Sequence, residues 1–424
     1  MRAEIITIGD ELLIGQVVDT NSAWMAERLN EVGISLHQIT SVHDNREHIL
    51  KALDEAFSRA DLVFTTGGLG PTKDDITKHV MCEYFGTSLV EDSHVRAHVH
   101  ELYKDRPEAL NRLTATQWLV PASATILPNR VGSAPIMVFE QNTTGEADLQ
   151  RSDLPSTAQR SKYLIALPGV PHEMKIAMTE QVLPYIGTQQ SYIGHQTLQV
   201  YGISESALAI QLEQYEASKP DYIHLAYLPK DGVIRLRLSS YGQATESELN
   251  QWFEQLQTIV APYLIATTDL PLECVLGALL QQKNQTIATA ESCTGGKLAA
   301  LLSKHSGSSA FYKGSVISYA NSVKRDVLGV SDEILNTHGA VSEETVIVMA
   351  NSIREQLGAD YGIAISGIAG PTGGTLDKPV GTVWMAWATP TQTIAECVQL
   401  GKLREQITDR ACQKAMIKLI QLLR

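Results

Sequence analysis

The chain has 424 residues, which is enough for about two to four domains of ordinary size. Hydrophobic residues make up 44% and charged residues 19%, as is typical of a globular protein. The net charge of −13 argues against a nucleic-acid partner, because binding to a phosphate backbone requires a basic face. Small anionic ligands remain compatible with this charge, since backbone amides can hold them.

Cysteine usage and hydropathy narrow the class of protein further. The five cysteines lie far apart and form no C-x-x-C pair, so neither a secreted disulfide framework nor a zinc ribbon is expected. The opening sequence MRAEIITIGDE lacks the basic and long apolar regions of a signal peptide. No stretch approaches the roughly 18 uninterrupted apolar residues of a membrane span. These features predict a cytoplasmic protein that has no membrane partner.

Apolar runs alternate with amphipathic helical patterns in the first part of the chain, which predicts an α/β fold with a parallel sheet. The expected strands and helices follow one another at 3–8, 20–32, 34–42, 46–59, 61–66 and 163–167. The polar stretch 141–161 predicts an inserted surface loop.

The middle of the chain predicts a small α+β module in the order βαββα. Its expected elements are 197–200, 205–215, 222–227, 233–238 and 245–260. The turn Pro229–Gly232 predicts that the second and third strands form a hairpin. The element order is KH-like, but a G-x-x-G loop is missing, which argues against RNA binding.

The last part predicts a second α/β sandwich. Its expected elements are 272–281, 286–289, 297–302, 315–319, 343–356, 361–366, 380–388 and 407–422. The predicted domains are therefore residues 1–185, 190–265 and 270–424.

A glycine cluster follows the strand 61–66, in the sequence TTGGLGPTKDDIT. Ligands of open α/β sheets bind where strands end, and glycines let the backbone approach a phosphate closely. Asp74 and Asp75 would repel that phosphate unless they hold a divalent cation. The alternative is a glycine turn with an acidic helix start. Asp10 and Glu11 follow the first strand and point either to the same crevice or to a capping turn.

Ser292 follows a predicted strand at the start of a predicted helix, in the sequence AESCTGG. A hydroxyl placed there can attack a carbonyl, and nearby amides can stabilise the oxyanion. Serine needs a base, and Tyr319 or Lys324 in SYANSVK is preferred to His305 or His338, because a desolvated lysine can accept a proton. The alternative is that Ser292 caps a helix and Lys324 is a solvated charge.

Two further features accompany this serine. The glycine-rich sequence ISGIAGPTGG follows strand 361–366 and suits close packing around a phosphate or ribose, or else is a plain turn. Cys293 is a second candidate nucleophile, although its neighbouring position predicts that it points away.

The first part resembles the N-terminal domain of the CinA family, which is similar to molybdopterin-binding proteins. The resemblance rests on GDELLIGQVVDTNS, TTGGLGPTKDDIT and LPGVPHEM. It implies metal-dependent cleavage of ADP-ribose, with a divalent metal and, as an open alternative, an added monovalent cation. The implied metal ligands are Asp10, Glu11, Asp74 and Asp75. The implied substrate-binding residues are Gly67, Gly68, Gly70, Thr72, Gly132, Pro135, Gly169, Pro171 and Glu173, and Asn21 also matches the family pattern. Ile136 replaces the last glycine of the family's N-x-x-G-x-A-P-G pattern.

The last part resembles the CinA C-terminal domain, a nicotinamide-nucleotide amidase, through AESCTGG, SYAN, HGAVSEE, ISGIAGPTGG and KPVGTVW. The resemblance implies hydrolysis of nicotinamide mononucleotide without a cofactor, with Ser292 as nucleophile and Lys324 and Tyr319 as proton carriers. The implied substrate-binding residues are Thr294, Gly295, Gly296, Asn321, Ser366, Gly367, Gly370, Gly373 and Arg404. Arg410 is the alternative to Arg404 as the phosphate contact.

The leading hypothesis is thus a two-site enzyme. The alternatives are an ADP-ribose pyrophosphatase as the main activity, and a pterin- or nucleotide-binding scaffold of competence or the DNA-damage response. The resemblance further implies a homodimer.

Overall fold

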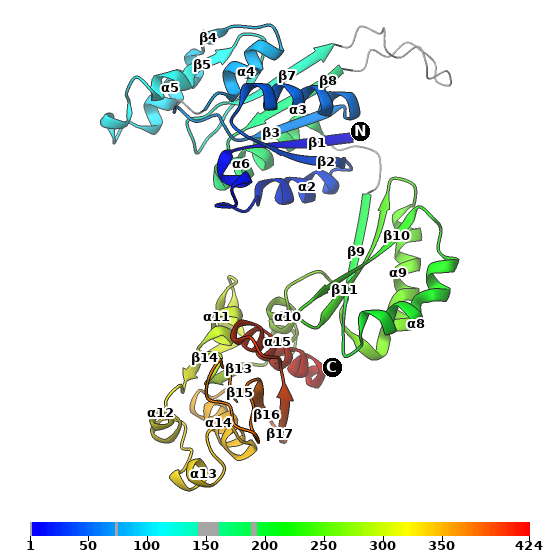
Figure 1. Cartoon of the computed structure of the whole chain (residues 1–424), viewed down its shortest axis with the longest axis vertical. Helices are drawn as coiled ribbons and strands as arrows, with labels where there is room; N and C mark the ends of the chain where they lie inside the picture. Colours follow the sequence, from blue (N-terminus) through cyan, green and yellow to red (C-terminus); the bar gives the residue numbers. More distant parts are fainter. Residues whose placement is uncertain (1, 73–74, 143–160, 188–192) are drawn as a thin grey trace. The chain divides into compact units, whose positions relative to one another are not determined.

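The computed structural model describes residues 2–72, 75–142, 161–187 and 193–424. The chain divides into two compact units, Met1–Gly194 with Ser239–Leu249, and His195–Leu238 with Asn250–Arg424. The predicted fold class is confirmed: an α/β N-terminal part, a small α+β middle module and a C-terminal α/β part, each built on a sheet of its own (Figure 1).

The N-terminal part is built on a six-stranded sheet in the order β2-β1-β3-β8-β7-β6. Strands β2, β1, β3 and β8 are parallel to one another, whereas β7 and β6 run antiparallel. The strands are β1 (Arg2–Ile8), β2 (Ser35–Val42), β3 (Leu62–Thr66), β6 (Thr125–Leu127), β7 (Ile136–Asn142) and β8 (Ser161–Leu167). The expectation of a parallel sheet therefore holds for the four strands β2, β1, β3 and β8 and was wrong for β7 and β6, where strands that are neighbours in sequence pair directly.

Helices cover both faces of this sheet, which buries an apolar layer on each side (Figure 1). One face packs against α2 (Asn21–Glu31) and α6 (Pro171–Ala177), and the other against α3 (Arg46–Arg59) and α4 (Thr77–Tyr84). The remaining elements are α1 (Asp10–Leu13), β4 (Leu89–Glu91), α5 (Ser93–Leu102), β5 (Leu119–Pro121) and α7 (Leu183–Ile186). Most of the predicted polar insertion at 141–161 lies outside the described residues.

The middle module has a four-stranded sheet in the order β10-β11-β9-β12. Its elements are β9 (Ile193–Tyr201), α8 (Glu205–Ser218), β10 (Ile223–Lys230), β11 (Val233–Tyr241), α9 (Glu246–Val260) and β12 (Leu264–Ala266). The predicted hairpin is present, but its turn is shorter than predicted. Asp231 and Gly232 both adopt left-handed backbone angles (φ 53° and 95°), so Pro229 belongs to edge strand β10, where proline is tolerated.

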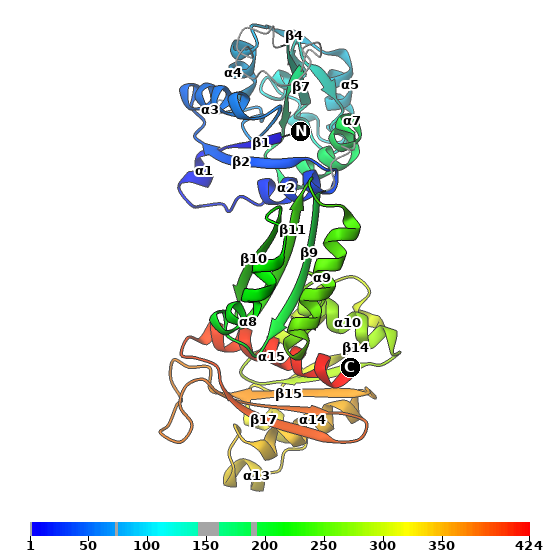
Figure 2. The same ribbon diagram turned by 90° about the vertical axis from the view of Figure 1, so that its right-hand side faces the viewer.

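The C-terminal part has a five-stranded sheet in the order β14-β13-β15-β16-β17, shown edge-on in Figure 2. Strands β14, β13 and β15 are parallel, and β16 and β17 add antiparallel strands. The strands are β13 (Ile287–Glu291), β14 (Tyr312–Ile317), β15 (Tyr361–Gly367), β16 (Thr382–Ala388) and β17 (Thr393–Gln399). Tyr319 was placed in a strand by the sequence pattern, but β14 ends two residues before it.

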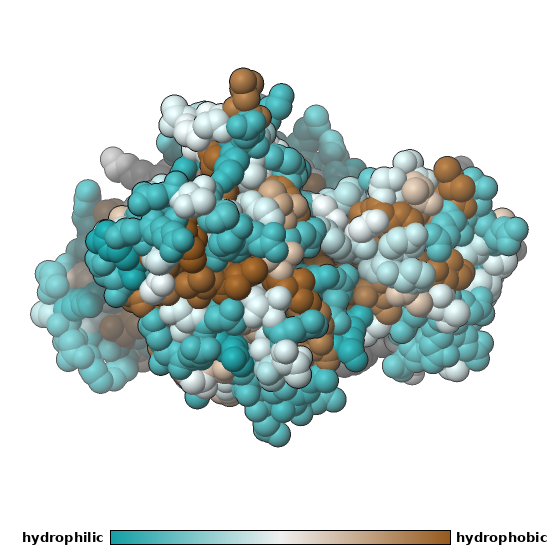
Figure 3. Space-filling model, turned by 90° about the horizontal axis from the view of Figure 1, so that it is seen from below, coloured by the Kyte–Doolittle hydropathy of each residue, from teal (hydrophilic) through white to brown (hydrophobic). Residues whose placement is uncertain are grey.

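Helices α10 (Leu272–Gln282) and α15 (Arg404–Leu423) pack on one face of this sheet, and α14 (Glu343–Gln356) packs on the other. The shorter helices are α11 (Lys297–Ser303), α12 (Asn321–Asp326) and α13 (Asp332–Thr337). Val233 and Ile265 of the middle module belong to the same buried core, so the module and the C-terminal part share packing. On the face drawn in Figure 3, hydrophobic side chains lie in groups among hydrophilic ones. Among the helices of the described residues, none has the length and apolar character needed to cross a membrane.

Candidate functional site

The register of three parallel strands brings the predicted catalytic segments together in the C-terminal part. Glu291 at the end of β13 pairs with Ile317 of β14 on one side and with Ile365 of β15 on the other. The chain leaves the sheet at Ser292 and Ser318, directly after two of these paired residues. The site therefore lies at the carboxyl ends of parallel strands, where open α/β sheets bind ligands.

Ser292 and Lys324 are in direct contact. The Lys324 Nζ donates to Ser292 Oγ at 3.0 Å and to the Ser318 carbonyl at 2.6 Å. The two side chains are buried, with Lys324 only 1% exposed. Burial lowers the pKa of the Lys324 amine below its ordinary value of 10.5, which favours the neutral form that can accept a proton. Lys324 is therefore not a solvated charge, and the helix cap of α11 is Gly296 rather than Ser292.

Cys293 is a poor nucleophile in this setting. Its side chain packs in the hydrophobic core with Leu298 and Cys412. Burial raises the pKa of its thiol to about 12, so the reactive thiolate is strongly disfavoured. The prediction that Cys293 points away from the reacting position agrees with this packing.

Tyr319 and Arg404 contact each other, and the Tyr319 carbonyl lies 3.5 Å from Lys324 Nζ. The Arg404 guanidinium donates to the Tyr319 hydroxyl at 3.1 Å and to the Gly370 carbonyl at 3.0 Å. Tyr319 is 61% exposed, and its hydroxyl takes no part in the hydrogen bond between Ser292 and Lys324. Arg410 instead donates to the Leu400 carbonyl at 3.1 Å. Of the two arginines, Arg404 is thus the one beside the predicted glycine-rich loop.

The other predicted substrate-binding residues surround this centre. Thr294 is buried, and its hydroxyl has no hydrogen-bond partner among the described residues. The Ser366 hydroxyl donates to the Ala340 carbonyl at 2.6 Å, and Asn321 is exposed at the start of α12. Four glycines of the site adopt left-handed backbone angles that other residues rarely tolerate: Gly295, Gly296, Gly370 and Gly373. Gly367 ends β15.

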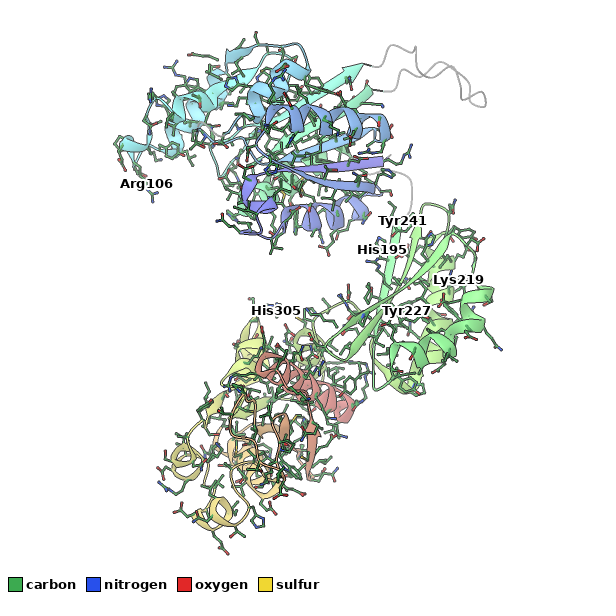
Figure 4. The ribbon with its side chains drawn as sticks, viewed as in Figure 1. Arg106, His195, Lys219, Tyr227, Tyr241 and His305 are labelled. Carbon is green, nitrogen blue, oxygen red and sulfur yellow. The ribbon has the colours of Figure 1, made fainter. Side chains whose placement is uncertain are left out.

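Neither nearby histidine contacts Ser292. His305 forms a long contact of 3.4 Å with Glu273, and His338 pairs with Glu344 at 3.0 Å. His305 lies at the outer edge of the C-terminal part in Figure 4. Lys324 therefore remains the base in contact with the serine.

A second candidate site is a cavity of about 550 Å³ in the N-terminal part. It lies at the carboxyl ends of β1, β3 and β8 and is lined by predicted residues of three segments: Glu11, Asn21, Gly67, Gly68, Gly70, Asp75, Gly169, Pro171 and Glu173. Only glycine fits at position 67, because the Cβ of any other residue would lie 2.0 Å from the Ile8 carbonyl oxygen. The buried Asn21 Oδ1 has no partner among the described residues.

Of the predicted acidic residues, Glu11 and Asp75 line this cavity, whereas Asp10 does not. The Asp75 carboxylate accepts hydrogen bonds from the Gly70 and Thr72 amides at 2.8 and 2.9 Å, so it shapes the glycine loop. Asp10 contacts His43 at 2.8 Å. Asp74 lies outside the described residues. Within the described ranges, no three His, Cys, Asp or Glu side chains are arranged to hold a metal ion by themselves.

Asp44 is an acidic residue of the cavity that the sequence patterns did not identify. Burial raises the pKa of its carboxyl group, and the negative charges of Asp10, Glu11 and Asp75 add to this effect. Its carboxylate accepts the Asp10 amide at 3.2 Å. The only sequence signal was its position just after β2, at the same sheet edge as Asp10.

Of the remaining predicted residues, Glu173 lines the cavity, whereas Gly132 and Pro135 flank its lining residues Ser133 and Ala134. The Glu173 carboxylate accepts from the Asn129 amide group at 3.0 Å, and a Cβ at Gly132 would lie 1.7 Å from Glu173 Oε2. Pro135 is buried just before β7. Ile136, the departure from the family pattern, is fully buried in the core and does not line the cavity.

Comparisons with known proteins cover almost the whole chain. Residues 4–188 match the family described as "Probable molybdopterin binding domain", residues 195–266 the "Damage-inducible protein CinA KH domain", and residues 269–423 the "CinA C-terminal domain". A CinA-like protein of Cytophaga hutchinsonii is 42% identical over 408 residues, which are 95% of this chain and 93% of that relative. A CinA-like protein of Flavobacterium psychrophilum is 40% identical over 425 residues, 98% of this chain and 97% of that relative. The solved competence damage-inducible protein A of Klebsiella pneumoniae shares 39% identity, covers 35% of this chain and 93% of its own, and has a TM-score of 0.35.

Proposed function

Because the chain belongs to the CinA-like family, we propose that its C-terminal part is a serine amidase that converts nicotinamide mononucleotide and water to nicotinate mononucleotide and ammonia. The observation that carries this proposal is the buried Lys324 amine 3.0 Å from Ser292 Oγ. A serine hydroxyl becomes an effective nucleophile only when a base accepts its proton, and a lysine of lowered pKa is such a base.

The proposed reaction has two halves. Ser292 Oγ attacks the carboxamide carbon while neutral Lys324 accepts the hydroxyl proton. The resulting oxyanion accepts hydrogen bonds from backbone amides beside Ser292. Lys324 then gives the proton to the leaving nitrogen, the C–N bond breaks, and ammonia departs. Water releases the acid from Ser292 by the same path in reverse, with Lys324 as base.

Arg404 is the proposed contact for the substrate phosphate. Its guanidinium is held by the Tyr319 hydroxyl and the Gly370 carbonyl. A planar guanidinium held by two partners retains further N–H donors for a phosphate. Tyr319 is the proposed link between this contact and the buried pair, since its carbonyl lies 3.5 Å from Lys324 Nζ.

The test is ammonia release from nicotinamide mononucleotide by the purified chain. We expect Ser292→Ala to abolish release and Cys293→Ala to retain it, since only the serine contacts a base. Circular dichroism of both variants checks that they are folded. Full activity of folded Ser292→Ala would refute the proposal.

A second candidate function, metal-dependent ADP-ribose cleavage, is favoured by the acidic cavity of the N-terminal part. Like charges crowd Asp44, and a divalent cation would offset them. Asp44, Glu11 and Asp10 are the residues that would hold it, and the ion would supply charge neutralisation at a pyrophosphate. A magnesium-type ion commonly binds one or two protein carboxylates together with substrate phosphates, so a closed set of three ligands is not required. The test is cleavage of ADP-ribose with and without added divalent cation.

A further inference from the structure

Glu291 is a fully buried carboxylate directly before the proposed nucleophile. Its side chain is 0% exposed. Its oxygens accept hydrogen bonds from three backbone amides, those of Gly296 at 3.1 Å, Leu298 at 3.0 Å and Ala299 at 2.7 Å. A buried carboxylate is tolerated only when such donors satisfy it, so the hydrogen bonds of this side chain hold it to the turn that follows.

The turn 292–296 carries the serine, and its backbone would be soft without this anchor. Gly295 and Gly296 have φ values of 61° and 96°, and glycine has many alternative conformations. Two other amides of the turn donate to backbone carbonyls, Ser292 N to Ile365 at 2.9 Å and Gly295 N to Ser292 at 3.1 Å. Among the described residues, Glu291 is the only one whose side chain accepts a hydrogen bond from a backbone amide of this turn.

Two amides of the same turn are left over. Among the described residues, no other residue accepts a hydrogen bond from the N–H groups of Cys293 and Thr294, and the Cys293 N–H contacts its own thiol. They directly follow Ser292, which is where a pair of donors can meet an oxyanion formed on that serine. The other amides from Ser292 to Ala299 each donate to an acceptor on another residue.

We propose that Glu291 is a positioning residue that holds the turn 292–296 so that the Cys293 and Thr294 amides face the oxyanion. The inference rests on the proposed role of Ser292 as nucleophile. Glu291 acts through the backbone and does not touch the proton path, because the Lys324 amine contacts Ser292 Oγ and the carbonyls of Ser318 and Tyr319.

The test compares Glu291→Gln with Glu273→Gln. Glutamine keeps the shape of Glu291 but places an amide NH₂ against backbone donors. Glu273 on α10 is also buried, at 8% exposed, and its carboxylate contacts His305, so it is a matched control away from the turn. We expect Glu291→Gln to lower kcat for ammonia release about 100-fold, with KM and the pH midpoint of the rate unchanged. Glu273→Gln is expected to keep the wild-type kcat.

A fluorophosphonate probe separates this inference from the choice of substrate. Ser292 Oγ displaces fluoride from phosphorus, and the phosphoryl oxygen uses the same amides, so the labelling rate of Ser292 should fall in Glu291→Gln as kcat does. If wild-type protein is labelled but releases no ammonia, nicotinamide mononucleotide is not its substrate. The comparison of labelling rates would still test the role of Glu291. Equal labelling of folded wild type and Glu291→Gln, or no labelling of wild type, would overturn the inference.

Should Glu291→Gln fail to fold, Gly295→Ala perturbs the turn from its exposed side. No atom lies within 4 Å of the added Cβ, so only the left-handed backbone angle is strained. The same loss of kcat and of labelling rate is expected. Unchanged labelling in folded Gly295→Ala would contradict the importance of the turn geometry.

Discussion

The N-terminal cavity and the C-terminal serine site occupy equivalent places in two α/β sheets but are built differently. Both lie at the carboxyl ends of parallel strands. The C-terminal site contains a nucleophile and a base already 3.0 Å apart and buried. The N-terminal cavity is lined by glycines and carboxylates, and its described lining residues include no such pair. Strand register can therefore assemble a reacting pair in one sheet and an anion-binding crevice with acidic walls in the other.

The difference has a cost in the C-terminal part. Burying an amine without a carboxylate partner opposes folding, and the carbonyls of Ser318 and Tyr319 only partly offset it. Functional sites commonly store such unfavourable features. In the cavity of the N-terminal part, the unfavourable feature is instead the repulsion between Asp44 and the like charges around it.

The largest expected effect comes from Lys324→Met. Removing the base should lower ammonia release by about 10²- to 10⁴-fold, because general-base catalysis contributes that much. Thermal unfolding should be unchanged or shifted upward, since methionine has no buried amine to desolvate. ADP-ribose cleavage should be unaffected. A folded Lys324→Met variant with wild-type ammonia release would contradict the role of Lys324 as the base, which is what distinguishes the C-terminal site from the N-terminal cavity.

The next effect is that of Asp44→Asn on the N-terminal cavity. Neutralising this carboxyl should weaken divalent-cation binding by more than about tenfold, measured by calorimetry with Mn²⁺ as the probe. The exposed Asp105→Asn, outside the cavity lining, is the matched control. Equal Mn²⁺ affinity of the two variants would remove Asp44 from the metal site. Ammonia release should not change in either.

The pH dependence of ammonia release sharpens the account of Lys324. Burial lowers the pKa of this amine below 10.5, and only the neutral amine accepts a proton. The rate should therefore rise about tenfold per pH unit below that pKa and level off above it. Unfolded lysine binds the proton more tightly, so the free energy of unfolding should also increase with pH between the two pKa values. A rate that falls with rising pH across this range would rule out a neutral-lysine base.

The smallest effect is expected for Cys293→Ala. The thiol is buried and its pKa is about 12, so its loss should change kcat less than about twofold. A small core cavity should lower the free energy of unfolding by about 1 kcal/mol, measured by urea denaturation. Loss of activity on the scale of Lys324→Met would make Cys293 the nucleophile instead.

Much of this arrangement was predictable because its signals are local. Hydrophobic periodicity gave α3 and α14 their observed bounds, and the AESCTGG and SYANSVK sequences identified Ser292 and Lys324. Their contact depends on the register of β13 and β14, which no local pattern contains. Asp44 is a lone acidic residue after an ordinary strand, so only the fold reveals its neighbours. Edge strand β17 was missed because its polar, partly exposed residues resemble a loop.

The most direct measurement follows both activities in one sample of wild-type protein during a titration with EDTA. The account predicts that ammonia release from nicotinamide mononucleotide persists, because the serine and lysine supply the chemistry, while ADP-ribose cleavage disappears as the divalent cation is removed. Joint loss of both activities in protein that stays folded would contradict the claim that the two regions use separate chemistry.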